Sequence, residues 1–245
     1  MTLHNGKQAT KRKNLTGHIV AVLTERIIQG AYPPDAPLRE IEIADDLGVS
    51  RSPLREALRV LSEQGLVDIA AGKGARVAPL TVRAAGEFYD VRAVIESYCT
   101  QLSVEVCSDA QLAQLMGAFA SLERAASEGD VAGFQDQNTD FHLLLYSFCQ
   151  NKTLVSVVDT VWKRGARYSR LLRLDSGRSK AILERKRELV RLIWSRDAQG
   201  AAECVRGIIL SGKEDVLAAI AAGDPFTYWE KAKARQRFAE VDSVK

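Results

Sequence analysis

Apolar residues recur at helical spacing along most of the chain. In the N-terminal third, this pattern predicts helices over 15–29 and 40–47 and a further helix inside the stretch 49–66. Ser50 is suited to cap that last helix, Pro53 to occupy its first turn, and Gly48 to end the preceding helix in a left-handed conformation. Two helices joined by a short turn that contains glycine predict a helix-turn-helix arrangement.

An alternating pattern then replaces the helical one. The apolar residues Leu66, Val67 and Ile69 come before the turn sequence 72–74, which is Gly-Lys-Gly, and Val77 comes after it. This alternation predicts two short strands joined by a glycine turn. A hairpin directly behind a helix-turn-helix predicts a winged domain, with Lys73 at the tip of the wing.

Strand signals are absent after the wing, and every segment from 81 to 222 has helical periodicity. Six helices with short connections predict an antiparallel bundle. The predicted helices are 81–107, 108–127, a third that ends near Cys149, 154–174, 179–195 and 197–222. The fold is therefore expected to be mainly α: a flexible basic arm (1–14), a winged helix-turn-helix domain with a small β-hairpin wing (15–78), a linker (79–83), an all-α antiparallel bundle (84–222) and a C-terminal tail with an additional helix (223–245).

Charge changes this picture only through its placement. The formal net charge is +3, which alone would not suggest nucleic acid as a partner. On a helix, however, Arg55 and Arg59 lie within about 80° of Arg51, while Leu54 and Leu58 gather on another arc. Three arginines on one face can reach phosphates and guanine edges. The alternative is an ordinary amphipathic helix with a solvated charged face.

The stretch 38–77, with the sequence LGVSRSPLREAL and the glycine turn, resembles the GntR family of bacterial transcription regulators. The resemblance implies that Ser50, Arg51, Ser52 and Arg55 contact operator DNA and that Gly72 enters the minor groove. Some members have an arginine where this chain has Ile41, which puts the operator sequence in doubt. The expected DNA-binding residues are Arg39, Ser50, Arg51, Ser52, Arg55, Arg59, Gly72, Lys73 and Arg76.

The bundle resembles the ligand-binding FCD domain of the FadR subfamily. The motifs are FYDVRAVIE (88–96), NTDFHLLLYSFCQNKTL (138–154) and SRDAQGAA (195–202). The resemblance implies a homodimer that binds a palindromic operator, usually as a repressor, under the control of a small effector. The alternative is a DNA-binding regulator whose bundle only dimerises and binds no effector.

Many FCD domains bind a divalent metal through one aspartate and three histidines. Residue by residue, the resemblance places Asn138, His142, Lys186 and Ile208 at those positions, so only one of the four ligands remains. A lysine cannot ligate until it is deprotonated. The chain contains only three histidines, so we expect no metal and no other cofactor.

The same positions can hold an anion directly. Arg92 matches an arginine that in the family points toward the effector cavity, and Lys186 adds a positive charge beside it. The alternatives are that Lys186 extends to solvent or pairs with Glu96, and that His142 is a hydrogen-bonded core residue. The expected effector-binding residues are Arg92, Asn138, His142 and Lys186, with Arg164 and Tyr168 as weaker candidates beside Trp162 and Arg167.

Several classes of protein are disfavoured by the sequence. It contains no GxSxG, no HExxH and no phosphate-binding glycine loop, so an enzyme is not expected. No apolar run approaches the roughly 20 residues of a membrane span, and the polar basic N-terminus is unlike a secretion signal. The four cysteines, Cys99, Cys107, Cys149 and Cys204, form no CxxC pair and are expected to be buried thiols in a reducing cytoplasm, where the protein associates with the nucleoid through DNA.

Overall fold

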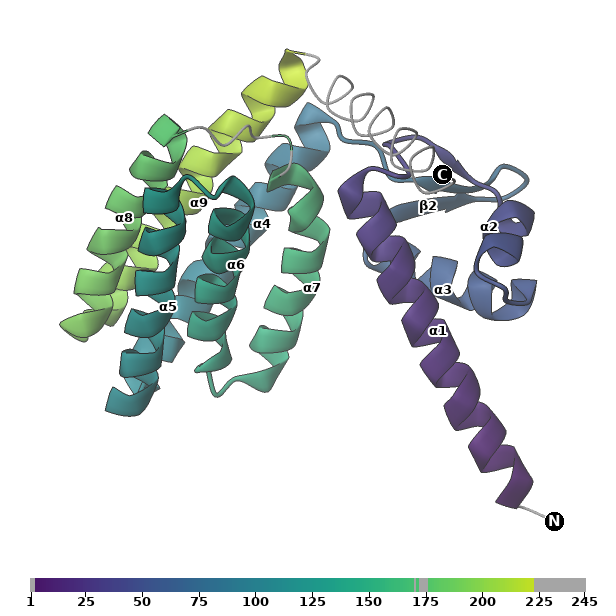
Figure 1. Ribbon diagram of the computed structural model, residues 1–245, viewed down its shortest axis with the longest axis horizontal. Coiled ribbons are helices and arrows are strands. Elements are labelled where there is room, and N and C mark those ends of the chain that lie inside the picture. The colour runs from purple at the N-terminus through teal and green to yellow at the C-terminus, as the bar shows by residue number, and fades with distance from the viewer. Residues whose placement is uncertain (1–2, 170, 172–175, 223–245) are drawn as a thin grey trace. The chain divides into compact units, whose positions relative to one another are not determined.

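The computed structural model describes residues 3–169, 171 and 176–222, and it describes side chains over 14–131, 133–168, 171 and 179–222 (Figure 1). The chain divides into two compact units. One comprises Met1–Thr81, Lys163–Leu171 and Ile220–Lys245, and the other comprises Val82–Trp162 and Leu172–Ala219. None of the helices in the described part is apolar over enough of its length to span a membrane.

The first unit contains the predicted winged helix-turn-helix. Its elements are α1 (Leu3–Gln29), β1 (Pro37–Leu38), α2 (Glu40–Asp46), α3 (Arg51–Glu63), β2 (Val67–Ala70) and β3 (Gly74–Val77). The strands form an antiparallel sheet in the order β1-β3-β2. In the wing, Val67 pairs with Val77 and Ile69 with Ala75. The turn between α2 and α3 is closed at Gly48, whose φ of +62° is the left-handed conformation expected from the sequence.

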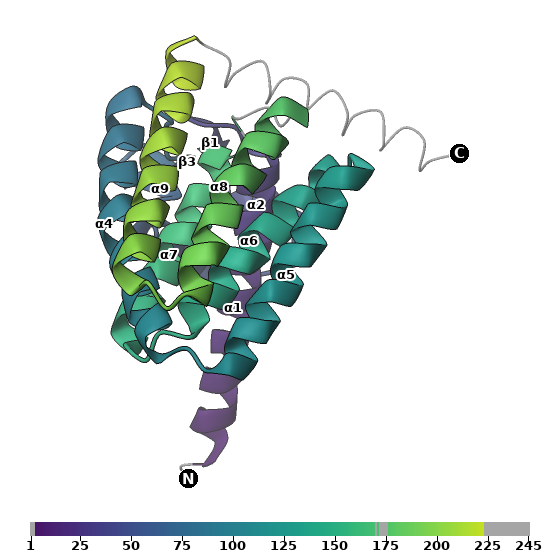
Figure 2. The same cartoon turned by 90° about the vertical axis from the view of Figure 1, so that its left-hand side faces the viewer.

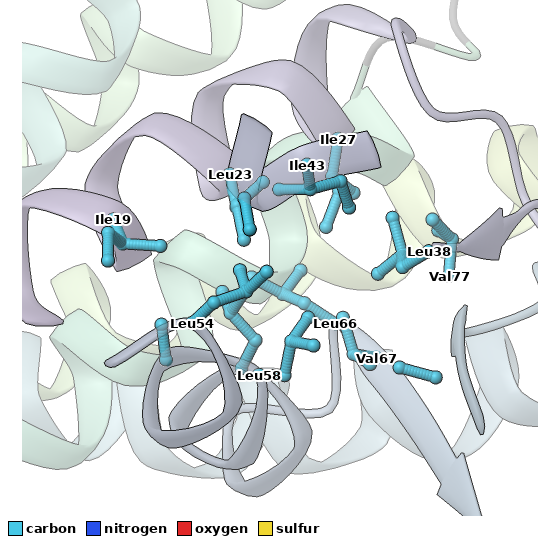
Figure 3. Close-up of a cluster of buried hydrophobic side chains, with 14 residues drawn as sticks. Ile19, Leu23, Ile27, Leu38, Ile43, Leu54, Leu58, Leu66, Val67 and Val77 are labelled. Carbon is cyan, nitrogen blue, oxygen red and sulfur yellow. The ribbon is translucent and has the colours of Figure 1, made fainter. Parts of the chain in front are cut away.

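Leucines and isoleucines from all three helices of this domain meet in one core (Figure 3). Helix α3 packs against α1, α2 and β2, and its Leu54 and Leu61 are fully buried. Ile19 and Leu23 of α1 close the core from the other side. Burying each such side chain stabilises the domain by about 1.5–3 kcal/mol. Since the apolar arc of α3 is buried in this core, its opposite arc is left for solvent or a ligand.

Two features of this domain differ from the prediction. Helix α1 begins at Leu3 and not at 15, so the expected flexible arm is helical where it is described. Residues 7–13 are mostly lysine, arginine, glutamine and alanine, which are good helix formers that extend a helix nucleated elsewhere. Strand β1 was not predicted because two residues carry no period. Its Pro37 is tolerated because β1 lies at the edge of the sheet.

Six helices form the bundle, as the sequence predicts, and they run side by side in both views (Figures 1 and 2). They are α4 (Val82–Val106), α5 (Asp109–Glu128), α6 (Val131–Ser147), α7 (Lys152–Ser169), α8 (Ser176–Trp194) and α9 (Ala198–Ala221). Helix α6 packs against α4 and α5, and α5 also packs against α8. A capping box is present at the start of α5, where Ser108 and Gln111 bond each other's backbone.

Some boundaries in the bundle differ from those predicted. Helix α7 ends at Ser169, before the predicted end at 174, and α8 begins earlier than predicted, at Ser176. The predicted tail helix (223–245) lies outside the described residues. Three of the cysteines are buried as expected, whereas Cys204 on α9 is partly exposed.

Candidate functional site

The exposed face of α3 carries the arginines that the sequence places there. The side chains of Arg51 and Arg55 are 56% and 57% exposed, and Arg59 is exposed one turn further along. Ser50, in extended backbone at the N-cap position, and Ser52 are exposed at the start of the same helix. The structure therefore places four of the predicted DNA-binding residues at the N-terminal end of the second helix of the helix-turn-helix, and a fifth, Arg59, further along the same helix. In helix-turn-helix proteins, that end of the recognition helix contacts base edges in the major groove.

A carboxylate on α2 binds two of these arginines. Oε2 of Glu40 accepts a hydrogen bond from Nε of Arg55 at 2.7 Å and one from Nη2 of Arg51 at 3.4 Å. The Glu40 side chain is 27% exposed, so it lies behind the guanidinium groups and leaves their outer edges open. Glu40 was not among the predicted functional residues. Its position at the start of α2, across the turn from α3, was the only signal in the sequence.

The wing offers a smaller basic surface. Gly72 and Gly74 both have a φ of +73°, a conformation that glycine adopts without strain, and Lys73 between them is exposed. The other two predicted DNA-binding residues are already engaged within the protein. Arg76 donates to the backbone oxygen of Asp35 at 3.0 Å, and Arg39 donates to Glu42 at 2.8 Å. Both guanidinium groups remain exposed. To bind either arginine, DNA would have to displace only a weak surface contact.

The bundle contains a buried polar cluster centred on Glu96 of α4. Glu96 is fully buried, and Oε1 accepts from Nε of Arg92 at 2.6 Å. Its Oε2 accepts from Nη2 of Arg92 at 3.3 Å, from the hydroxyl of Tyr146 at 2.8 Å and from Nε1 of Trp162 at 3.0 Å. The Glu96 carboxylate raises the pKa of Arg92, despite the opposing effect of burial, which is the largest single influence. Arg92 and Glu96 therefore form a charge-balanced buried pair.

Aromatic rings enclose this pair. The Arg92 guanidinium carbon lies 5.0 Å from the ring centroid of Tyr89 and 5.3 Å from that of Trp162. The imidazole of His142 stacks on Tyr146 at 5.8 Å, and its Nδ1 is 3.3 Å from the Tyr146 hydroxyl. Burial lowers the pKa of His142 well below its ordinary value, and the positive charges of Lys186 and Arg92 lower it further. His142 is therefore a neutral imidazole at neutral pH.

Lys186 on α8 is the least satisfied member of the cluster. It is 1% exposed, so it does not extend to solvent, and its ammonium has no hydrogen-bond acceptor among the described residues. Its Nζ lies 4.2 Å from the ring centroid of Phe141. Burial lowers the pKa of Lys186 well below its ordinary value, although the charge of Glu96 partly opposes this. Both alternatives considered for Lys186 are therefore wrong: it does not extend to solvent, and it forms no hydrogen bond with Glu96 among the described residues.

Not every predicted effector residue joins the cluster. Asn138 lies one turn before His142 on α6 and is partly buried. Arg164 and Tyr168 belong to the first unit instead of the bundle, and the guanidinium of Arg164 lies against Gly65, where an added Cβ would meet it at 2.9 Å. Helical geometry explains why Arg164 is outside the cluster. It comes two positions after Trp162 and so points to the opposite side of α7.

Two central members of the cluster were not among the predicted site residues: Tyr146, and Glu96, which the sequence analysis considered only as a partner of Lys186. Each had a signal: Glu96 is an acid one turn after Arg92 on an otherwise apolar arc, and Tyr146 is one turn after His142. Neither residue matched a motif with assigned chemistry. Trp162, considered only as a weaker candidate, is a direct hydrogen-bond donor to Glu96.

The donor set at the family's metal positions does not fit a divalent cation. It comprises an amide, one imidazole, an amine and an aliphatic chain, at Asn138, His142, Lys186 and Ile208. Within the described part of the chain, no three histidine, cysteine, aspartate or glutamate side chains are grouped so that they could hold a metal. Transition metals favour imidazole, thiolate or carboxylate ligands, and this set supplies only one of these groups.

Comparison with known proteins agrees with this architecture. Residues 15–77 match the family described as bacterial regulatory proteins of the gntR family, and residues 87–211 match the FCD domain. The chain is 26% identical over 185 residues to an uncharacterized HTH-type transcriptional regulator, YdhC, of Bacillus subtilis, a match that covers 75% of this chain and 82% of that protein.

Two further relatives extend the comparison. A probable D-xylose utilization operon transcriptional repressor of Paenarthrobacter nicotinovorans is 29% identical over 144 residues, 59% of this chain and 63% of that one. The solved structure of McbR/YncC from Escherichia coli superposes with a TM-score of 0.68 at 24% identity, covering 80% of this chain and 94% of that one, and so shares its fold. The chain belongs to the FCD-domain family and is a DNA-binding transcriptional regulator of the GntR type, not an enzyme.

Proposed function

We propose that the protein is a FadR-subfamily repressor that binds a palindromic operator as a homodimer and responds to a small anionic metabolite bound in the bundle. The observation that carries the effector part is the buried amine of Lys186, which has no acceptor in the described part of the chain, beside the balanced pair of Arg92 and Glu96. A carboxylate in this place gives Lys186 the acceptor that it lacks. The unsuitable donor set at the metal positions supports direct binding of that anion, without a bridging cation.

The operator part follows from the exposed face of α3. A homodimer places two such helices in successive major grooves, about 34–36 Å apart, which requires a palindromic site. Arg51 and Arg55 are free at their outer edges to reach guanine, and Lys73 is placed at the tip of the wing for the adjacent backbone. The effector acts by favouring one arrangement of the two helices over another. The repressor named for the relative from Paenarthrobacter supports repression as the mode of action.

One observation favours the alternative in which the bundle only dimerises. The oxygens of Glu96 are satisfied by Arg92, Tyr146 and Trp162, so most of the cluster is complete without a ligand. In that case, Lys186 is an uncompensated polar group in a closed core. The alternative predicts that no metabolite changes either the stability of the bundle or the affinity for DNA.

A thermal-shift screen combined with operator binding tests the proposal. The protein is treated with a chelator and mixed with succinate, pyruvate, gluconate or citrate, or with zinc or nickel. The proposal expects at least one carboxylate to raise the melting temperature by mass action and to change affinity for an operator selected from random DNA. Stabilisation by zinc or nickel but by no carboxylate would contradict metal-independent binding. Loss of the carboxylate effect in Lys186→Met, but not in Lys180→Met on the exposed face of α8, places the ligand at Lys186.

A further inference from the structure

The amine of Lys186 has an environment that disfavours its charge. It is 1% exposed and has no acceptor among the described residues, and its polar contact is with the face of Phe141 at 4.2 Å. A cation-π contact gives about 0.5–2 kcal/mol, whereas removing an ammonium from water costs several kcal/mol. The amine is therefore better accommodated in its neutral form than as an ammonium.

The carboxylate of the cluster does not reverse this balance. Four hydrogen bonds from Arg92, Tyr146 and Trp162 already use the oxygens of Glu96. Burial consequently lowers the pKa of Lys186 well below its ordinary value. Each unit by which the pKa falls increases the neutral fraction at pH 7 about tenfold. A neutral, desolvated lysine is a nucleophile toward carbonyl carbon, unlike the protonated lysines of the surface.

Hydrogen bonds also define which nitrogen of His142 carries a proton. The hydroxyl of Tyr146 donates to Glu96 at 2.8 Å, so its oxygen acts as an acceptor toward Nδ1 of His142 at 3.3 Å. Nδ1 must then carry the hydrogen, and Nε2 is the nitrogen that has the lone pair. The cluster thus combines a neutral amine with an imidazole that can take up and return a proton.

We infer that Lys186 binds its effector covalently and reversibly, as an imine with the carbonyl group of a small oxo acid. This inference rests on the proposed function and names the class of its ligand. The lone pair of Nζ attacks the carbonyl carbon to give a carbinolamine. Transfer of the two amine protons to the former carbonyl oxygen and loss of one water then leave a C=N bond. No oxidant or reductant takes part, and hydrolysis by the same water returns the free amine and the oxo acid.

The acid group of the ligand follows from the charges around the amine. Arg92 is neutralised by Glu96, so a protonated imine would add a net positive charge to a buried cluster. A carboxylate on the same ligand compensates that charge, as a simple aldehyde or ketone does not.

Reductive trapping tests the inference. The full-length protein is incubated at pH 7 with glyoxylate or pyruvate and sodium cyanoborohydride, which reduces an imine to a stable secondary amine. Intact mass and peptide mapping then measure the adduct, whose mass is that of the probe less one oxygen atom. We expect the adduct at Lys186 in preference to the exposed Lys180 of the same helix, by about tenfold or more per bound probe. Lactate, which has a hydroxyl in place of the carbonyl of pyruvate, gives no adduct.

A matched pair of variants separates chemistry from charge. Lys186→Arg keeps a long basic side chain but has no nucleophilic amine, and it loses the adduct, whereas Lys180→Arg retains it. Mapping within the wild-type protein makes the same comparison should Lys186→Arg fail to fold. An adduct spread evenly over surface lysines, or none, overturns the inference.

The same samples distinguish the inference from the proposed function. If lactate and pyruvate stabilise the protein equally and no adduct forms, the anion site stands and the imine does not. If Lys186 is trapped but the affinity for operator DNA is unchanged, the imine stands and the effector role is wrong.

Discussion

The Nε atom of Arg55 lies 2.7 Å from Oε2 of Glu40, so a residue of the supporting helix holds an arginine of the recognition helix. The same oxygen accepts from Arg51 at 3.4 Å. Both arginines are more than half exposed, so the pairs contribute little to stability. Their effect is on orientation: a guanidinium fixed at one edge has fewer conformations to lose when its other edge meets a base.

Replacing Glu40 therefore changes specificity more than stability. Glu40→Gln removes the negative charge behind Arg51 and Arg55, which strengthens attraction to any phosphate but leaves the guanidinium groups less ordered. We expect the ratio of operator to non-operator affinity to fall by about 1 kcal/mol, a part of the 1–3 kcal/mol that a bidentate contact contributes. Fluorescence anisotropy with a selected operator and a scrambled duplex measures the ratio. Glu123→Gln on α5, which removes the charge beside the exposed Arg187, is the control and leaves the ratio unchanged.

Removing an arginine of α3 tests base recognition directly. Arg55→Ala is expected to weaken operator binding by about 1–3 kcal/mol and to relax discrimination at one position of the site. Leu54 and Leu58 stay buried, so the fold is retained. Arg124→Ala removes an exposed charge from α5 and serves as the control for net charge. Full discrimination by Arg55→Ala would refute the assignment of α3 as the recognition helix.

Lys73 at the tip of the wing is expected to act through phosphate. Lys73→Ala should weaken binding to all duplexes by a similar factor, because a phosphate contact carries no sequence information. The slope of log affinity against log salt should decrease by about 0.9, because the variant neutralises one phosphate fewer than the wild type. Titrations at several salt concentrations measure this slope. Weakening confined to the selected operator would instead show that Lys73 contacts a base.

The sequence predicts the winged domain well because its core, its turns and its exposed residues follow local rules. The apolar arc of α3 identified Leu54 and Leu58 as core, and Gly48 identified the turn before α3. Strand β1 was not predicted, because its two residues form a strand only by pairing with β3, which is distant in the sequence. The start of α1 was predicted wrongly for a different reason. A helix that has formed in a packed segment can extend into neighbouring residues that have no apolar face.

The buried cluster was predicted only in part, for a similar reason. Periodicity identifies a buried face, and the motifs supplied Arg92, His142 and Lys186, but neither indicates which polar groups satisfy one another. Glu96 and Tyr146 come from different helices, and their 2.8 Å hydrogen bond depends on the packing of α6 against α4. Arg164 was misplaced because its proximity to Trp162 in the sequence, without helical phase, does not say which side of α7 it faces.

The buried pair of Arg92 and Glu96 should contribute far more to stability than an exposed pair with the same spacing. Glu96→Gln leaves the Arg92 guanidinium buried without a counter-charge, and we expect the free energy of unfolding to fall by about 3 kcal/mol. Helix α4 supplies the control, because Arg83 and Glu87 form an exposed pair four residues apart. Glu87→Gln should cost less than about 1 kcal/mol. Urea denaturation followed by circular dichroism compares the two, and equal losses would contradict the burial of Glu96.

Lys186 should make the stability of the protein depend on pH above neutrality. Burial lowers its folded pKa below the unfolded value near 10.5, so in the window between these two values the unfolded chain binds one more proton than the folded chain. Stability then rises with pH across the window, by at most about 1.4 kcal/mol per pH unit. The groups that act on the amine from the helices around it are Glu96 of α4, His142 of α6 and Cys204 of α9. The pKa of His142 lies below 6.5, and burial raises the pKa of the Cys204 thiol, so measurements from pH 7 to 8 report mainly on the lysine.

Lys186→Met removes the titrating group while retaining a long flexible side chain against Phe141. The variant should lose the rise in stability with pH. It should also be more stable than the wild type at pH 7, by about 1–3 kcal/mol, because a buried donor without an acceptor is removed. The gain should shrink as pH increases, since the wild type recovers stability as its unfolded lysine deprotonates. Lys180→Met, on the exposed side of α8, is the control and changes neither quantity. A variant with the same pH slope as the wild type would mean that Lys186 remains charged in the folded protein, in which case the amine is not the nucleophile that imine formation requires.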